Sequence, residues 1–568
     1  MNEDLLFADR FMAVAGLPPV PVPDTLADAN AASRFLSQTT FGPDRESITD
    51  LSGGSASAWF RSQLNTPSSS YLNRVFDLLS EPGATDPSGQ PTFQGRRAPN
   101  HAFWQLAIES DDQLRQRMAF ALSQILVISN AMNTQLFDWP TAVGYYQDVL
   151  VTHAFGNYRD LLEAVTFSPA MGSYLTYLQN TLGDPATGRV PDENYAREIM
   201  QLFTIGLVAL QDNGVPVLDN GEAVELYNNS DVTGLARVFT GMSLDTDVFF
   251  FGFNELNSGA QYRPMRLFPE WHSPLEKRFL DTVIPAGTGP EESIRIALDA
   301  LFEHPNTPPF VCRQLIQRLI SSDPSADSVA RAVRAFCTGT FPLPDGSQVG
   351  EGRRGDLAAT LAAIIFDPEA RLEPDSPQRF GKIREPVIRF TQWARAFEVS
   401  PVVPRALPVL DFTGNSEDLS QAPFQSPSVF NFYRPAYVAP GTASGAAGMT
   451  VPELQIVNAN ALFGASNFMQ FFITGEAAAE AQNQGVDSFI PDYAAALALA
   501  SDPQALVADL DTLLNHGASS SITRDRIAEL IETFPITTPG DPDDPGAGKR
   551  VELAILMLMT SPDYVVQR

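Results

Sequence analysis

Helical periodicity recurs along almost the whole chain and limits its fold more than any other feature. In residues 25–38, apolar side chains recur at helical spacing until a Phe-Gly-Pro sequence ends the segment. Such a stripe must be buried against other helices. The same period predicts helices at residues 55–64, 70–79, 100–110, 112–129, 141–154, 157–167, 192–208, 231–242, 291–304, 310–320, 325–336, 356–366, 385–397, 452–472, 503–515, 521–534 and 549–560.

One region departs from this pattern. Residues 244–289 are rich in aromatic residues, glycine and proline, and residues 248–253 and 265–268 are the best strand candidates. We therefore expect a mostly α fold, a large multi-helix body with a small irregular or β insert around residues 244–289. Residues 1–25 read as an N-terminal extension and 26–568 as a single large helical domain, with subdivision at the loops 342–354 and 440–448 as an alternative.

The charge balance excludes some functions. The 568 residues contain 37 Lys and Arg against 67 Asp and Glu, a net charge of -30. No cluster of basic residues offers a nucleic-acid interface, and attraction to an anionic membrane is equally disfavoured. Only Lys277, Lys382 and Lys549 are lysines. We expect no nucleic-acid partner.

Two cysteines, Cys312 and Cys337, are too few for a disulfide framework. Cys312 opens one predicted helix and Cys337 closes the next, so that antiparallel packing would bring them together. A disulfide between them is one alternative, and two buried thiols are the other.

The N-terminus does not resemble a secretory signal, because it has no basic start and prolines follow its apolar stretch. The longest uncharged run, residues 118–137, contains seven polar side chains, which favours a buried helix and a turn over a transmembrane segment.

Familiar catalytic motifs are absent, including G-x-S-x-G, G-x-x-x-x-G-K, G-x-G-x-x-G, H-E-x-x-H and C-x-x-C. The sequence identifies no cofactor and no metal. Its densest polar group lies in the predicted helix 192–208, where Asn194, Glu198 and Gln201 form a stripe beside a buried face. A half-buried Glu198 could act as a general base or metal ligand, and an ion pair with an arginine such as Arg237 is the structural alternative.

Three further residues are weighed individually. Asp231 suits the first turn of its helix. His272 lies in a loop with aromatic residues and Lys277 nearby, where binding residues concentrate. His304 ends a helix before a proline, and a capping role is favoured over metal ligation.

Nine segments, in this order, resemble a bacterial family known as domain of unknown function 1800. They are ASRFLSQTTFGP (32–43), RMAFALSQIL (117–126), HAFGNYRDLL (153–162), RVPDENYARE (189–198), DVTGLARVFTG (231–241), HPNTPPF (304–310), KIREPV (382–387), SVFNFYRP (428–435) and SPDYVVQ (561–567). The resemblance implies a mostly helical, exported protein that works beside a secreted partner similar to sulfatases and phosphatases. The chain departs from family members that carry a histidine pair at 120–124, and Ser273 replaces the acid that often follows the loop histidine. Both departures weaken a metal site.

Two functions follow. The first is an exported hydrolase or lyase acting on a polymer or glycan, with Glu198, Asp231, His272 and Lys277 as catalytic candidates in one cleft. Further binding candidates are Asn194, Arg197, Arg237, His304 and Arg434. The second is a non-catalytic surface or assembly protein that binds its secreted partner or forms homo-oligomers. We expect a periplasmic or extracellular location, with the cytoplasm as the alternative.

Overall fold

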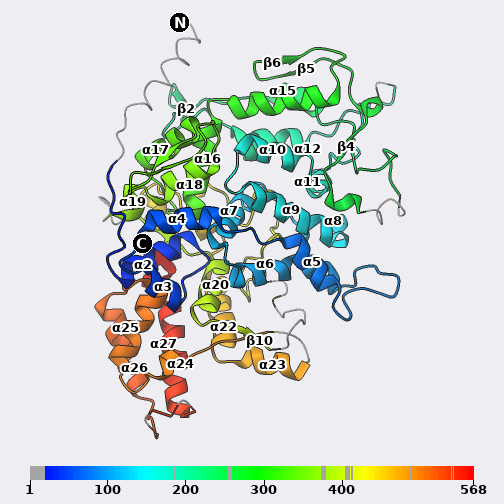
Figure 1. Ribbon diagram of the computed structural model, residues 1–568. Coiled ribbons are helices and arrows are strands. Elements are labelled where there is room, and N and C mark those ends of the chain that lie inside the picture. Colours follow the sequence, from blue (N-terminus) through cyan, green and yellow to red (C-terminus); the bar gives the residue numbers. More distant parts are fainter. Residues whose placement is uncertain are drawn as a thin grey trace.

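The computed structural model describes residues 20–568 except 185, 253–258, 373–378, 403–409, 411–412, 485–487, 539 and 542. Helices dominate the described chain, which confirms the mostly α prediction (Figure 1). The N-terminal half contains α2 (Ala29–Thr39), α3 (Arg45–Leu51), α4 (Ala56–Asn65), α5 (Tyr71–Leu79), η1 (Gly95–Arg97), α6 (Ala98–Glu109), α7 (Gln113–Ser123), α8 (Thr134–Asp138), α9 (Pro140–His153), α10 (Tyr158–Thr166), α11 (Pro169–Tyr174), α12 (Asn194–Glu198), the π-helix η2 (Ile199–Thr204) and α13 (Asn229–Ala236).

Further helices fill the C-terminal half. They are α15 (Pro290–Glu303), α16 (Thr307–Leu319), α17 (Ala326–Thr338), α18 (Leu357–Ile365), α19 (Pro368–Arg371), α20 (Pro386–Ala396), α21 (Ala443–Ala446), η5 (Pro452–Gln455), α22 (Ala459–Ile473), α23 (Glu476–Gln484), α24 (Ala494–Leu497), α25 (Pro503–Asn515), α26 (Ser521–Glu532), α27 (Pro545–Thr560) and α28 (Pro562–Val565). In Figure 1, α25, α26 and α27 lie together at the lower left, and α15 with β5 and β6 lies at the top. None of the described helices is both long and apolar enough to cross a bilayer.

The strands form only two-stranded antiparallel pairs in the described chain. These are β1 (Leu218–Asp219) with β2 (Glu222–Ala223), β3 (Met242–Ser243) with β4 (Arg266–Leu267), β5 (Lys277–Phe279) with β6 (Thr282–Ile284), β7 (Phe341–Pro342) with β8 (Gln348–Val349), β9 (Lys382–Ile383) with β12 (Val566–Gln567), and β10 (Ser400–Pro401) with β11 (Phe489–Ile490).

The insert at 244–289 is only partly as predicted. A strand does form within 265–268, where β4 pairs with β3, and the short 3-10 helices η3 (Ala260–Tyr262) and η4 (Pro269–Trp271) flank it. The predicted strand at 248–253 is wrong for its described residues, and residue 253 lies outside them. There the ring of Phe249 stacks on Trp271 at 5.0 Å between centroids, and its carbonyl accepts hydrogen bonds from Gln179 and Ser243. Side-chain contacts take the place of a strand ladder.

Helix starts follow local capping chemistry. Asp28 accepts a hydrogen bond from the Ala31 amide at 2.9 Å, and Asp44 forms a reciprocal capping box with Ser47. The N-terminal part of the chain meets the C-terminal part, because α2 packs on α25 and the Arg34 guanidinium donates to the Arg568 carbonyl at 3.1 Å.

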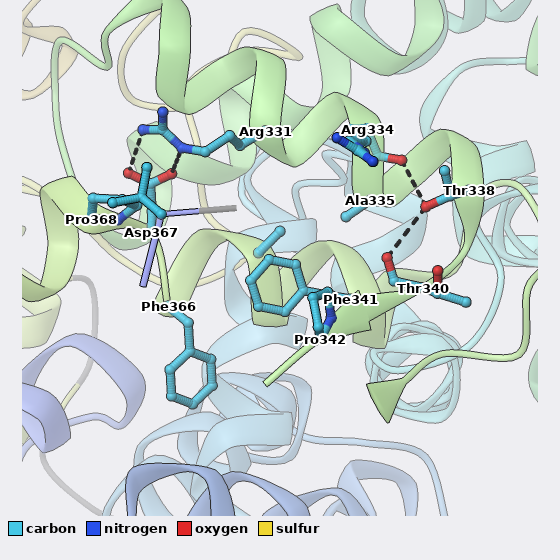
Figure 2. A pocket seen from close by; sticks show the side chains of 12 residues that line it. Arg331, Arg334, Ala335, Thr338, Thr340, Phe341, Pro342, Phe366, Asp367 and Pro368 are labelled. Carbon is cyan, nitrogen blue, oxygen red and sulfur yellow. Dashed lines mark hydrogen bonds and ion pairs between the residues drawn. The ribbon is translucent and has the colours of Figure 1, made fainter. Parts of the chain in front are cut away.

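An apolar cavity of about 170 Å³ lies between α17, β7 and α19 (Figure 2). Phe341, Pro342 and Phe366 form part of its wall. At one end Asp367 accepts two hydrogen bonds from Arg331, at 2.7 and 2.9 Å. This bidentate pair joins α17 to the start of α19, so both charges are compensated beside the cavity.

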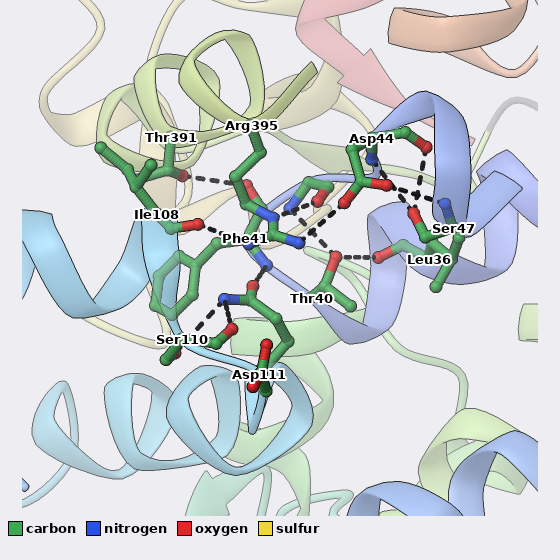
Figure 3. Close-up of polar contacts among 12 residues, drawn as sticks. Leu36, Thr40, Phe41, Asp44, Ser47, Ile108, Ser110, Asp111, Thr391 and Arg395 are labelled. Carbon is green, nitrogen blue, oxygen red and sulfur yellow. Dashed lines mark hydrogen bonds and ion pairs between the residues drawn. The ribbon is translucent and has the colours of Figure 1, made fainter. Parts of the chain in front are cut away.

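Arginine side chains tie loops to the helical body. Arg395 of α20 donates to the carbonyls of Gly42 and Ile108, both at 2.6 Å, and to Asp44 at 3.1 Å. Figure 3 shows its guanidinium between Ile108 and Asp44. The Phe41 amide donates to Gln113 at 3.1 Å. One guanidinium therefore holds the turn after α2 against α6 and α20.

A buried charge cluster connects three further segments. Lys382 lies 2.5 Å from Glu453 and 3.4 Å from Glu385, and all three side chains are almost fully buried. Gln124 and Gln421 donate to Glu385 at 2.6 and 2.7 Å. Burial raises the pKa of Glu385, but nearby cations, Lys382 foremost, outweigh it and hold that pKa at about 2.

Candidate active site

Glu198 stands at a change of helix type. The α-helix α12 ends at this residue, and the π-helix η2 continues the chain until Gly206 turns it away with a positive φ of 74°. Tyr195, Ile199 and Phe203 are buried and form the apolar face beside the polar stripe. π-helical turns frequently occur at functional sites because they shift one residue out of the regular helical register.

The Glu198 carboxyl is half-buried and poorly compensated. Its Oε2 atom is buried and has no hydrogen-bond partner within the described chain. Burial raises the pKa of Glu198 to about 7, against the lowering effect of Arg197. The alternative of an ion pair with Arg237 is not found, because the Arg237 guanidinium donates to the Glu276 carbonyl at 2.9 Å.

Two tyrosines lie within electrostatic range of Glu198. Tyr174 ends α11 and Tyr227 precedes α13, and each is partly buried. Burial, followed by the Glu198 charge, raises the pKa of both phenols to about 12. The Tyr227 hydroxyl is buried and has no hydrogen-bond partner among the described residues. A carboxyl that can gain or lose a proton near neutral pH thus acts electrostatically on two phenols that keep theirs.

The neighbouring polar residues join α12 to α13. Arg197 lies 3.4 Å from Glu193 and donates to Asn229 at 3.2 Å. The Thr233 hydroxyl donates to Glu193 at 2.7 Å. Asn194 is exposed and donates to Thr176 at 2.7 Å, away from these contacts.

The Asp231 carboxylate accepts hydrogen bonds from backbone amides. Its Oδ2 accepts the Asn228 amide at 2.9 Å in a capping box, as its first-turn position suggested, and its Oδ1 accepts the Leu280 amide at 2.7 Å. Both oxygens are engaged, so Asp231 links α13 to the β5–β6 turn.

The structure brings Arg237, His272 and Lys277 together, but no described contact joins them to Glu198. His272 is buried between the Thr240 carbonyl at 3.0 Å and the Ser293 hydroxyl at 3.3 Å. Burial, assisted by the Lys277 charge, lowers its pKa to about 4. Burial and the Arg237 charge lower the pKa of Lys277 to about 8.

The other predicted residues lie elsewhere. His304 is at the C-cap of α15, where its Nδ1 accepts the Asn306 amide at 3.1 Å. The residue thus lies at the end of its helix, where the capping role was predicted. Arg434 is exposed, with its guanidinium 5.0 Å from the Phe430 ring centroid.

Both cysteines are free thiols. Cys312 is buried in α16, and Cys337 in α17 lies 3.3 Å from Nη1 of Arg354. Of the two alternatives, the pair of buried thiols is closer to the structure, although Cys337 is only partly buried. Across the described chain, no group of His, Cys, Asp or Glu has a metal-binding arrangement.

Sequence reasoning missed Tyr174 and Tyr227. Neither belongs to the polar stripe of residues 192–208, and their relation to Glu198 depends on the packing of three short helices. The one signal in the sequence was the position of Tyr227, just before the helix that starts near Asp231. This helix, α13, packs beside the segment that carries Glu198.

Comparison with known proteins agrees with the resemblance in the motifs. A family model described as "Protein of unknown function (DUF1800)" matches residues 34–566, nearly the whole chain. No curated protein and no solved structure matches the chain.

Proposed function

Because the chain belongs to this family of proteins of unknown function, we propose its chemistry from the site itself, as an acid-base enzyme that cleaves a polymer or glycan by elimination. The observation that supports this most is the buried, unpartnered Oε2 of Glu198, with Tyr174 and Tyr227 within electrostatic range of it. A lyase is favoured here over a hydrolase.

Glu198 is the proposed base. A general base works best when its pKa lies near the working pH, because both its forms are then populated. The pKa of about 7 meets that condition. The carboxylate takes the proton on the carbon next to the substrate's carboxyl group, and the electron pair forms a carbon–carbon double bond as the bond to the leaving oxygen breaks.

A tyrosine is the proposed acid. The leaving oxygen needs a proton, and a phenol with a pKa of about 12 is protonated at neutral pH. Tyr227 is favoured over Tyr174, because no described group occupies its hydroxyl. The proton taken by Glu198 returns to solvent, and the phenol is reprotonated before the next turnover.

Hydrolysis by two carboxyl groups is less well supported. It commonly uses a pair about 5–10 Å apart, one of which must be free to act as base or nucleophile. The other carboxylates on the two helices, Glu193 and Asp231, are held by Arg197, Thr233 and backbone amides. Elimination needs one carboxylate and one proton donor.

The test is a screen of uronate-containing polysaccharides for the ultraviolet absorbance of an unsaturated product. With a cleaved substrate, Glu198→Gln should lower kcat at least about 100-fold. The matched control is Glu193→Gln, which changes a carboxylate one turn away that is already engaged. A Glu198→Gln variant with full activity would exclude this base. The absence of product from every polymer would favour the non-catalytic binding alternative.

A polymer substrate does not enter a cell readily, so this proposal also places the protein outside the cytoplasm, as the family resemblance implies.

A further inference from the structure

An open cleft of about 670 Å³ lies between α13 and β5, and both apolar and polar groups line it. Asn229, Ser230, Thr233 and Arg237 line it from α13, and Glu276 and Arg278 line it from the other side. The walls are closely fixed to each other, since a Cβ on Gly234 would lie 1.6 Å from the Arg278 carbonyl oxygen. The α13 helix and strand β5 therefore pack in direct backbone contact beside the cleft.

Positive charge exceeds negative charge around this cleft. Arg237 donates only to the Glu276 carbonyl among described residues, and forms no ion pair there. Lys277, the first residue of β5, is fully buried. It donates to the carbonyls of Ser273 at 3.0 Å and Leu275 at 3.4 Å. Of the lining residues only Glu276 is acidic, and it is paired with Arg278 at 2.5 Å.

This local excess stands out in a chain with a net charge of -30. Burial of the Lys277 ammonium without a carboxylate partner costs free energy, and the charge of Arg237 repels this ammonium further. An anion bound at Arg237, in the cleft beside β5, would reduce that free-energy cost. Guanidinium groups suit this role because they bind carboxylates with paired hydrogen bonds.

The cleft also adjoins the candidate active site. Asn229, which lines it, accepts a hydrogen bond from Arg197, the residue before Glu198, at 3.2 Å. Thr233 donates to Glu193 on the same helix. A chain-like ligand that lies along α13 would therefore pass from Arg237 towards α12.

We propose that the α13–β5 cleft binds the carboxylate groups of an acidic polysaccharide, with Arg237 and Arg278 as its recognition residues. This inference rests on the proposed elimination at Glu198, since that reaction needs a carboxylate beside the carbon that loses its proton. It names the substrate class as a uronate polymer rather than a neutral glycan.

The test is binding of short oligogalacturonates by isothermal titration calorimetry, with maltooligosaccharides of the same length as the neutral comparison. We expect binding of the acidic series only, weakening as salt rises. Arg237→Gln and Arg278→Gln should each weaken it roughly 10-fold to 100-fold, the range for losing a charge-assisted hydrogen bond. Arg278 is mostly exposed, so its variant should fold even if Arg237→Gln does not.

The matched control is Arg295→Gln, which removes an exposed, ion-paired arginine from α15 and should leave affinity unchanged. Equal binding of neutral and acidic oligosaccharides, or wild-type affinity in both cleft variants, would overturn the inference.

Glu198→Gln separates the two proposals. Retained binding with lost turnover supports both. Lost turnover in Glu198→Gln with unchanged affinity in the cleft variants overturns only the proposal that the cleft binds carboxylates. Full turnover in Glu198→Gln with weakened binding in the cleft variants overturns only the proposal that Glu198 is the general base.

Discussion

Glu198 should make the folded protein less stable as pH rises. Its pKa is about 7 in the folded chain and 4.5 as an ordinary glutamate, so the folded state holds the proton more tightly than the unfolded state. The free energy of unfolding therefore falls between pH 4.5 and about pH 7 and stays lower above that range. The Glu198→Gln variant has no such proton and should lack this fall.

The size of the effect follows from the two pKa values. Each tenfold change in acidity corresponds to about 1.4 kcal/mol, and the 2.5 units between the two pKa values give an upper limit of about 3.5 kcal/mol at pH 8.5. Water reaches part of the Glu198 side chain and screens its charge, so we expect about 1–2 kcal/mol. At pH 4 both states carry the neutral acid, and the variant should match the wild type.

Urea unfolding at pH 4, 6, 7 and 8.5, followed by circular dichroism, would measure this difference. Other titrating groups contribute equally to both proteins and cancel in the comparison. Glu193→Gln is the control, and its difference from the wild type should not follow this pH profile. Glu198→Gln and the wild type with equal stability at pH 8.5, or a gap that is the same at every pH, would refute the reasoning.

Three further predictions concern the body of the fold. Gly234→Ala should destabilise the protein by about 2 kcal/mol or more, because the new Cβ would meet a backbone carbonyl. Gly548→Ala, in open space, should stabilise it by about 0.5–1 kcal/mol. Thermal unfolding would contradict this reasoning if both variants changed the melting temperature in the same direction. Glu453→Gln should lower the free energy of unfolding by at least about 2 kcal/mol, since it removes the closest partner of the buried Lys382, and a neutral result in urea would argue against the pair. Lys277 should titrate near pH 8 by NMR of isotope-labelled lysine side chains, and an ordinary value near 10.5 would show that its ammonium is hydrated.

The sequence predicted the helical class well because the period of apolar residues survives local irregularity. The predicted helix 100–110 corresponds to α6, and 503–515 coincides with α25. Residues 192–208 became a short α-helix followed by a π-helix, a difference the apolar pattern does not resolve, since both bury Tyr195, Ile199 and Phe203. The strand predicted at 248–253 was wrong because aromatic residues there pack on Trp271 instead of on a neighbouring strand.

The candidate site was predicted in part. The half-buried Glu198 followed from its place on the edge of an apolar stripe. Tyr174 and Tyr227 could not be found in the same way, because they reach Glu198 only through the packing of separate segments. The catalytic roles first assigned to Asp231, His272 and Lys277 remain predictions, and their contacts to backbone groups give them structural work as well.

The buried pair of Lys382 and Glu453 spans the loop 440–448, one of the two places where the sequence could divide into subdomains. A protease cut in that loop would leave each fragment with half of a charge pair that water cannot reach. The two fragments should therefore stay together as a nicked complex, and each should be insoluble when expressed alone. Expressed together, they form a natural pair for split-protein complementation.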